Sequence, residues 1–272
     1  MLWRALISRV GAGLAASPAH TIRSLAPCQG PIRYICQGLL VLAVTALPTP
    51  SAARCPDLAL VLAIDASGSV EDAEFQLQLQ GYSSAFRSVA VQQAIQSVGE
   101  VEVAVVIWAD GEMSAQILPF RDVSSLKASL DLADRIQGMR RAVTGNTGIG
   151  RGLWEALDLI EQQMPCALRR VVNVSGDGKE SFGARPRTSM PLAVARLRAE
   201  TMGVTVNALA IQSEVKDLAY WYDANLIIGA GAFVMSISAL SSFAEAIEHK
   251  LVREISNPML AAGQVVEQPI FD

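Results

Sequence analysis

The feature that most constrains the fold is a continuous apolar run at residues 58–64, which ends directly at Asp65. Apolar runs without polar alternation are typical of parallel strands that are covered on both faces. Further strands are expected at residues 101–108, 171–174 and 204–211, with a shorter edge strand at 116–120 and a last strand from 225–228 with 232–235. These segments predict a buried, mostly parallel sheet.

Segments with apolar residues at helical spacing alternate with these strands. Residues 70–98 predict one long helix, because Phe75, Leu79, Tyr82 and Phe86 recur at that spacing. Further helices are expected at residues 124–136, 146–164, 191–202 and 241–255. The alternation predicts an α/β fold, a doubly wound, mostly parallel sheet flanked by helices. We expect it to occupy residues 54–256, followed by a C-terminal tail at 257–272.

Residues 1–53 have a different charge from the rest of the chain. They contain four arginines and no acidic residue, whereas residues 54–272 hold 18 basic and 26 acidic residues. A basic region, an apolar core at residues 38–47 and small residues up to Ala53 predict a signal peptide cleaved before Arg54. The alternative is a retained N-terminal anchor helix. The apolar core is shorter than the roughly 20 residues that span a bilayer.

This leader predicts an exported protein, periplasmic or extracellular, with no membrane span in the mature chain. The mature chain is acidic, so nucleic-acid binding is not expected.

Oxygen-bearing side chains follow the predicted strands. Asp65, Ser67 and Ser69 come directly after the first apolar run, Thr147 lies in a glycine-containing loop before a helix, and Asp177 follows a later strand. In sheets of this kind, ligands bind outside the carboxyl ends of the strands. Two carboxylates and three hydroxyls suit a hard divalent cation such as Mg²⁺. The sequence therefore predicts a metal site at this edge.

These motifs resemble the metal-ion-dependent adhesion site of von Willebrand factor A domains. The resemblance rests on Asp65-x-Ser67-x-Ser69, on Thr147 in Gly-Asn-Thr-Gly and on Asp177-Gly, and it covers about residues 57–256. It implies that the three hydroxyls bind Mg²⁺ or Mn²⁺, and that both aspartates bind directly or through water. A partner protein, whose identity is unknown, would supply an acidic group. More narrowly, the chain is similar to a bacterial family of exported A-like proteins of unknown function.

One motif departs from the usual pattern of A domains, and purely structural roles for these residues stay open. The third motif reads Ser-Gly-Asp-Gly, where Thr-Asp-Gly or Ser-Asp-Gly is commoner. Ser69 is also placed to cap the following helix. Thr147 is equally explained as a cap or turn residue, and Asp177 as a turn aspartate.

The predicted function is an exported, metal-dependent protein-binding module. The alternatives are a structural envelope domain without metal and a metal-dependent hydrolase. An enzyme is not expected, because the mature chain has a single histidine, His249, and lacks a Walker loop and a Gly-x-Ser-x-Gly elbow.

Cys55 and Cys166 form a candidate disulfide of the exported chain. The A-domain resemblance implies the strand order 3-2-1-4-5-6, in which the first strand and the strand at 171–174 are neighbours. Cys55 lies ten residues before Asp65, and Cys166 lies eleven before Asp177. These matched offsets set both sulfurs at the sheet edge opposite the metal motifs. The alternative is two free buried thiols.

Other polar and aromatic residues receive ordinary interpretations. Asp110 and Glu112 are expected in a solvated loop that adds negative charge near the site. Two arginine pairs, Arg140-Arg141 and Arg169-Arg170, are expected on the surface. Core or rim positions are expected for the aromatic residues Trp108, Tyr220, Trp221, Tyr222 and Phe233.

Overall fold

The computed structural model of this chain describes residues 55–109, 114–182 and 190–256. The predicted leader at 1–53, the tail at 257–272 and the acidic residues Asp110 and Glu112 lie outside the described residues.

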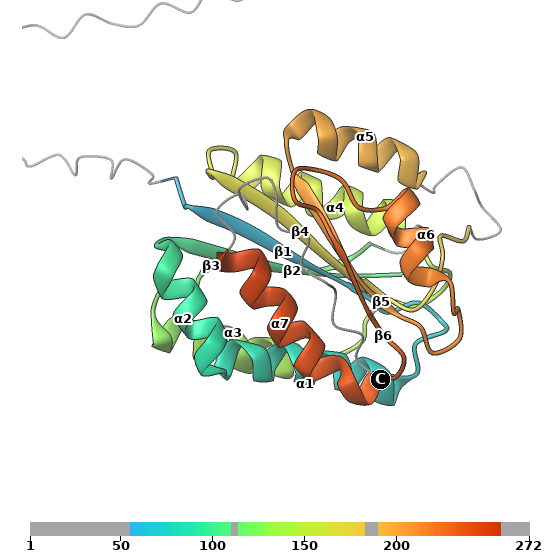
Figure 1. The fold of residues 1–272 in the computed structure, drawn as a ribbon, viewed down its shortest axis with the longest axis horizontal. Helices are drawn as coiled ribbons and strands as arrows, with labels where there is room; N and C mark the ends of the chain where they lie inside the picture. Colours follow the sequence, from blue (N-terminus) through green and yellow to red (C-terminus); the bar gives the residue numbers. More distant parts are fainter. Residues whose placement is uncertain (1–54, 110–113, 183–189, 257–272) are drawn as a thin grey trace, which may run out of the picture. The chain divides into compact units, whose positions relative to one another are not determined.

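A six-stranded sheet in the order β3-β2-β1-β4-β5-β6 forms the centre of the described residues (Figure 1). All neighbouring pairs are parallel except β2 and β3, which are antiparallel. The strands are β1 (Leu58–Asp65), β2 (Val101–Trp108), β3 (Gln116–Asp122), β4 (Arg169–Gly176), β5 (Thr205–Ile211) and β6 (Val234–Ile237). The predicted fold class and strand order are confirmed.

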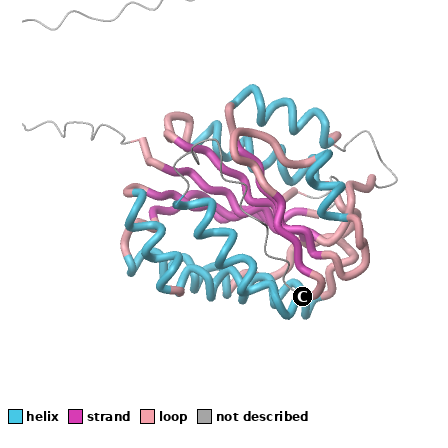
Figure 2. The backbone as a smooth tube through the Cα atoms, in the orientation of Figure 1, coloured by secondary structure: helices cyan, strands magenta, loops and turns pink. Residues whose placement is uncertain are grey.

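Helices cover both faces of the sheet (Figure 2). The helices on one face are α1 (Asp72–Arg87), α2 (Val89–Val98), α3 (Leu126–Gln137) and α7 (Phe243–Ser256), and those on the other face are α4 (Ile149–Gln163), α5 (Leu192–Met202) and α6 (Leu218–Asn225). Successive residues of β1 alternate between the two cores: Leu60 and Leu62 pack on the α1 side, whereas Val61 packs on the α4 side. A strand with two buried faces needs apolar residues at every position, which explains the continuous run.

The single helix predicted at 70–98 is wrong, because the structure divides this segment into α1 and α2. Ser88 lies between them with extended backbone angles, φ −71° and ψ 148°, and its side chain accepts a hydrogen bond of 3.2 Å from the Val91 amide. Serine therefore ends one helix and caps the next. The apolar spacing continues through the break, so periodicity alone did not reveal it.

The last strand also differs from the prediction. Residues up to Asn225 belong to α6, which the sequence reasoning missed, and Ile228 makes only an isolated antiparallel bridge with Val206. Gly229 and Gly231 have positive φ angles of 102° and 72° and turn the chain before β6.

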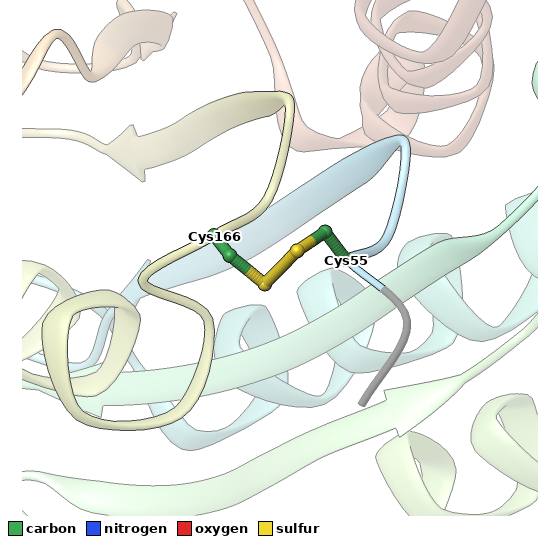
Figure 3. Close-up of a disulfide and its surroundings, with 2 residues drawn as sticks. All are labelled: Cys55 and Cys166. Atoms are coloured by element: carbon green, nitrogen blue, oxygen red, sulfur yellow. A yellow bond between two sulfur atoms is a disulfide. The ribbon is translucent and has the colours of Figure 1, made fainter. Parts of the chain in front are cut away.

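A disulfide joins Cys55 and Cys166 with a Cα–Cα distance of 5.2 Å (Figure 3). The parallel register that pairs Leu58 with Arg169 brings the starts of β1 and β4 together and sets the two sulfurs side by side. The alternative of two free buried thiols is therefore wrong in this structure.

A buried ion pair between Lys250 and Glu254 lies on the inner face of α7. Glu254 also accepts hydrogen bonds from the side-chain amides of Asn173, at 2.8 Å, and Asn207, at 3.0 Å. These bonds compensate for the removal of both charges from water. No local sequence pattern marks this cluster.

None of the described helices is both long enough and apolar enough to cross a membrane.

Candidate functional site

The structure brings all five predicted site residues together at one edge of the sheet. Asp65 is the last residue of β1, and Ser67 and Ser69 lie in the turn that follows. Asp177 comes directly after β4, the neighbour of β1, and Thr147 lies just before α4. Because β1 and β4 are parallel, their carboxyl ends deliver both aspartates to the same place.

The hydroxyl and carboxylate oxygens form a continuous cluster. Ser69 Oγ donates a hydrogen bond of 2.8 Å to Asp177 Oδ1, and the Oγ atoms of Ser67 and Ser69 are 3.3 Å apart. Thr147 Oγ1 lies 3.4 Å from Ser67 Oγ. Asp65 Oδ1 stabilises this turn, because it accepts a hydrogen bond of 2.7 Å from the Ser67 amide.

Asp65 is the most unusual member of this cluster. Its side chain is fully buried, and Oδ2 has no hydrogen-bond partner among the described residues. Burial, with a further contribution from the negative charge of Asp177, raises the pKa of Asp65 to about 7. Burial also raises the pKa of Asp177. Two buried carboxylates with an unpartnered oxygen form a site that favours positive charge.

The helix-cap interpretation of Ser69 is wrong. Helix α1 begins after Glu71, whose amide donates a hydrogen bond of 2.9 Å to Glu74 Oε2. Ser69 Oγ instead bonds to Asp177, far along the chain. Thr147 is not the cap of α4 either, because Gly148 holds that position.

Glycine in the unusual third motif has a packing reason. A Cβ on Gly176 would lie 2.8 Å from Tyr222 Oη and 2.9 Å from Asp65 Oδ2. Tyr222 is fully buried and donates a hydrogen bond of 3.0 Å to the Gly178 carbonyl, so it supports the turn that carries Asp177. The glycine of Ser-Gly-Asp-Gly therefore leaves room for both the Tyr222 hydroxyl and the Asp65 carboxylate.

Several supporting residues were missed by the sequence reasoning. Ser181 makes two hydrogen bonds with the backbone of Thr147. Its Oγ accepts a bond of 2.9 Å from the Thr147 amide, and its own amide donates a bond of 2.9 Å to the Thr147 carbonyl. Glu180 accepts hydrogen bonds from the amides of Gly150, at 3.0 Å, and Leu192, at 3.1 Å, and thus ties α4 to α5. No sequence motif marks either residue.

The position of Arg141 also differs from the prediction. The expectation that it lies on the surface is wrong, because its side chain is only 17% exposed and its guanidinium bonds to the backbone of the Ser67 turn. A single arginine in a loop carries no sequence signal for such a role, since its partners lie about 70 residues away along the chain.

The fold of the described residues, a doubly wound sheet with one antiparallel edge strand, is similar to that of von Willebrand factor A-like domains. Solved structures agree on the fold. The von Willebrand domain of the type V pilus tip protein Mfa5 from Porphyromonas gingivalis has a TM-score of 0.50 at 11% identity, covering 79% of this chain and 99% of that one.

Two other similar structures are the pilus adhesin SpaC from Lactobacillus rhamnosus GG and proximal thread matrix protein 1 from the mussel byssus. SpaC has a TM-score of 0.52 at 12% identity, covering 74% of this chain and 30% of SpaC. The mussel protein, described with a zinc-occupied MIDAS motif, has a TM-score of 0.50 at 20% identity, covering 74% of this chain and 48% of that one. The present chain thus spans half or less of these two proteins.

The chain belongs to the family described as "Protein of unknown function (DUF1194)", whose model matches residues 54–259. No curated protein matches the sequence.

Proposed function

We propose that this protein is an exported binding module that uses a divalent cation to hold an acidic group of a partner protein. The observation that carries the proposal is the buried Oδ2 of Asp65, which has no hydrogen-bond partner in the part of the chain that the structure describes and lies beside three hydroxyls and a second buried carboxylate. A buried carboxylate oxygen without a hydrogen-bond donor is costly, and a cation removes that cost.

The donor set fits Mg²⁺ or Mn²⁺, because it consists of oxygens alone. Ser67, Ser69 and Thr147 would hold the cation through their hydroxyls, and Asp65 and Asp177 would hold it directly or through water. The hydroxyl of Ser69 donates its proton to Asp177 and so keeps its lone pairs for a cation. When bound, the cation would supply the positive charge that attracts a carboxylate. The zinc-occupied motif described for the mussel byssus protein supports divalent metal use in this fold.

Export is the second part of the proposal. The predicted signal peptide at residues 1–53 and the disulfide between Cys55 and Cys166 both fit an oxidising compartment, periplasmic or extracellular. The similar pilus proteins SpaC and Mfa5 also support an adhesive or interaction role. We further propose that residues 54–256 form the binding domain and that 257–272 form a tail.

Calorimetric titration with Mn²⁺ tests the metal site. We expect saturable binding at one site in the wild type and loss of binding in Asp65→Ala and in Ser67→Ala/Ser69→Ala. Ser88→Ala is a matched control, because Ser88 caps α2 and bonds only within that region. A wild type that takes up no Mn²⁺ or Mg²⁺ would contradict the proposal and favour a structural domain without metal.

The partner is tested separately by crosslinking in the envelope fraction. We expect the wild type in Mn²⁺ to give one reproducible crosslinked partner protein. This crosslinked product should disappear when a chelator is added and when Asp65→Ala replaces the wild type. Crosslinking that is indifferent to the chelator would overturn the metal-dependent mode of binding.

A further inference from the structure

Arg141 makes an unusual set of contacts with the turn that carries Ser67 and Ser69. Its Nη2 donates hydrogen bonds to the carbonyls of Ala66, at 2.8 Å, and Ser67, at 2.7 Å. Its Nη1 donates to the Val70 carbonyl at 2.8 Å. Three backbone carbonyls of one short turn therefore accept hydrogen bonds from a single side chain.

The same guanidinium is attached to the beginning of α1 and to its own loop. Nη1 also forms an ion pair of 3.0 Å with Asp72, the first residue of α1, and Nε donates to the Val143 carbonyl at 3.3 Å. The loop that starts at Arg141 continues to Thr147, the third hydroxyl of the site. Arg141 thus joins two of the three chain segments that build the cluster.

A direct backbone contact reinforces this junction. The Gly68 amide donates a hydrogen bond of 2.6 Å to the Gly145 carbonyl, and a Cβ on Gly68 would lie only 3.2 Å from that oxygen. The turn and the loop therefore pack closely at the point where their hydroxyls meet, with Thr147 Oγ1 3.4 Å from Ser67 Oγ.

Only an arginine satisfies this geometry. A guanidinium has five donors in a rigid plane, whereas a lysine ammonium has three donors at one point. The contacts of Arg141 come from Nε, Nη1 and Nη2 together, and they reach carbonyls in two segments. A lysine at this position keeps the charge but cannot make these bonds at once.

We propose that Arg141 is the positioning residue of the metal site, which holds the Ser67 turn against the Thr147 loop before a cation arrives. This inference rests on the proposed function. Holding ligands in place before binding lowers the ordering cost of binding and so raises affinity. Arg141 touches neither the cation nor the partner in this scheme, and it acts through the backbone of Ala66, Ser67 and Val70.

The test compares Arg141→Lys with Arg140→Lys, a matched control at the exposed neighbouring position. In calorimetric titrations with Mn²⁺, we expect Arg141→Lys to bind about tenfold more weakly or worse, which corresponds to roughly 1.4 kcal/mol. Arg140→Lys should keep the wild-type affinity. Arg141→Met, which removes the charge as well, should bind no better than Arg141→Lys.

Amide hydrogen exchange in the metal-free protein provides a second, independent readout. We expect faster exchange at Gly68, whose amide bonds across to the Thr147 loop, in Arg141→Lys but not in Arg140→Lys. A purely structural role would lower the melting temperature and leave both the Mn²⁺ affinity and this local exchange unchanged.

The outcomes separate the two proposals. Wild-type Mn²⁺ affinity in a folded Arg141→Lys overturns the positioning role and leaves the metal site standing. Failure of the wild type itself to bind Mn²⁺ overturns the proposed function. In that case, unchanged Gly68 exchange in Arg141→Lys also overturns the holding of the turn, and faster exchange supports it.

Discussion

Ser69 Oγ donates a hydrogen bond of 2.8 Å to Asp177 Oδ1, across a separation of 108 residues. Replacing Ser69 with alanine removes this donor and one hydroxyl of the cluster. We predict that Ser69→Ala weakens Mn²⁺ binding about tenfold or more and lowers the free energy of unfolding by about 1–2 kcal/mol, because the buried Asp177 carboxylate loses a donor.

The control for this prediction is Ser88→Ala. Ser88 caps α2, so its loss should cost about 1 kcal/mol of stability and leave Mn²⁺ affinity unchanged. Calorimetry and urea unfolding of both variants measure the two effects. Wild-type Mn²⁺ affinity in Ser69→Ala, or an equal loss of affinity in Ser88→Ala, would contradict this prediction.

The raised pKa of Asp65, about 7 in the folded protein against 3.8 ordinarily, predicts a pH dependence of stability. Between these values the folded state keeps a proton that the unfolded state releases. The contribution of Asp65 in metal-free protein is therefore full below about pH 4 and is lost as pH rises through about 7. The free energy of unfolding, measured in chelator at about pH 5 and about pH 8, should fall by a few kcal/mol.

Asp65→Asn isolates this effect, because the amide does not titrate. The decline of stability with pH should be clearly smaller in this variant than in the wild type. A residual decline is expected, because burial raises the pKa of Asp177 as well. Equal pH dependence in the two proteins would show that Asp65 is not the titrating group. In the wild type, Mn²⁺ should restore stability at about pH 8, because binding requires the deprotonated carboxylate.

The disulfide should stabilise the fold without changing the Mn²⁺ affinity of the oxygen cluster. It joins residues 111 positions apart at the start of β1 and just before β4, whereas the oxygen cluster lies at the other end of these strands. We predict that Cys55→Ser/Cys166→Ser loses about 2–5 kcal/mol of unfolding free energy. Mn²⁺ affinity of the folded variant should equal that of the wild type. A large loss of affinity would mean that the two ends of the sheet are coupled.

Breaking the buried ion pair between Lys250 and Glu254 should cost a large part of the free energy of unfolding. Lys250→Met removes the cation beside the buried carboxylate of Glu254 and leaves it the hydrogen bonds from Asn173 and Asn207. We expect a loss of about 3–5 kcal/mol, measured by urea unfolding at neutral pH. Glu245→Ala, at an exposed position of the same helix, should change stability by less than about 0.5 kcal/mol. A similar small effect in both variants would contradict this prediction.

The strands themselves and the sheet edge that carries the cluster were predictable from local pattern, whereas the strand order followed from the resemblance to A domains. The continuous apolar run before Asp65 requires a strand with two buried faces, and parallel strands bring their carboxyl ends to one edge. The side chains of Asp65 and Asp177, which directly follow two such strands, were therefore expected at the same edge of the sheet. The break at Ser88 was not predictable in this way, because apolar spacing continues across it and only the extended backbone of one residue separates the helices.

The resemblance to A domains implied the strand order and, with it, the pairing of Cys55 and Cys166. By itself, the sequence determined the class of fold and the edge of the sheet where Asp65, Ser67, Ser69, Thr147 and Asp177 gather. These follow from short-range patterns of apolar residues and turns. Only the tertiary structure decided that Oδ2 of Asp65 is buried without a hydrogen-bond partner among residues 55–109, 114–182 and 190–256, that Arg141 bonds to a turn about 70 residues away, and that Lys250 is buried. Burial and hydrogen-bond partners depend on segments distant in sequence, and no local pattern encodes which of them meet.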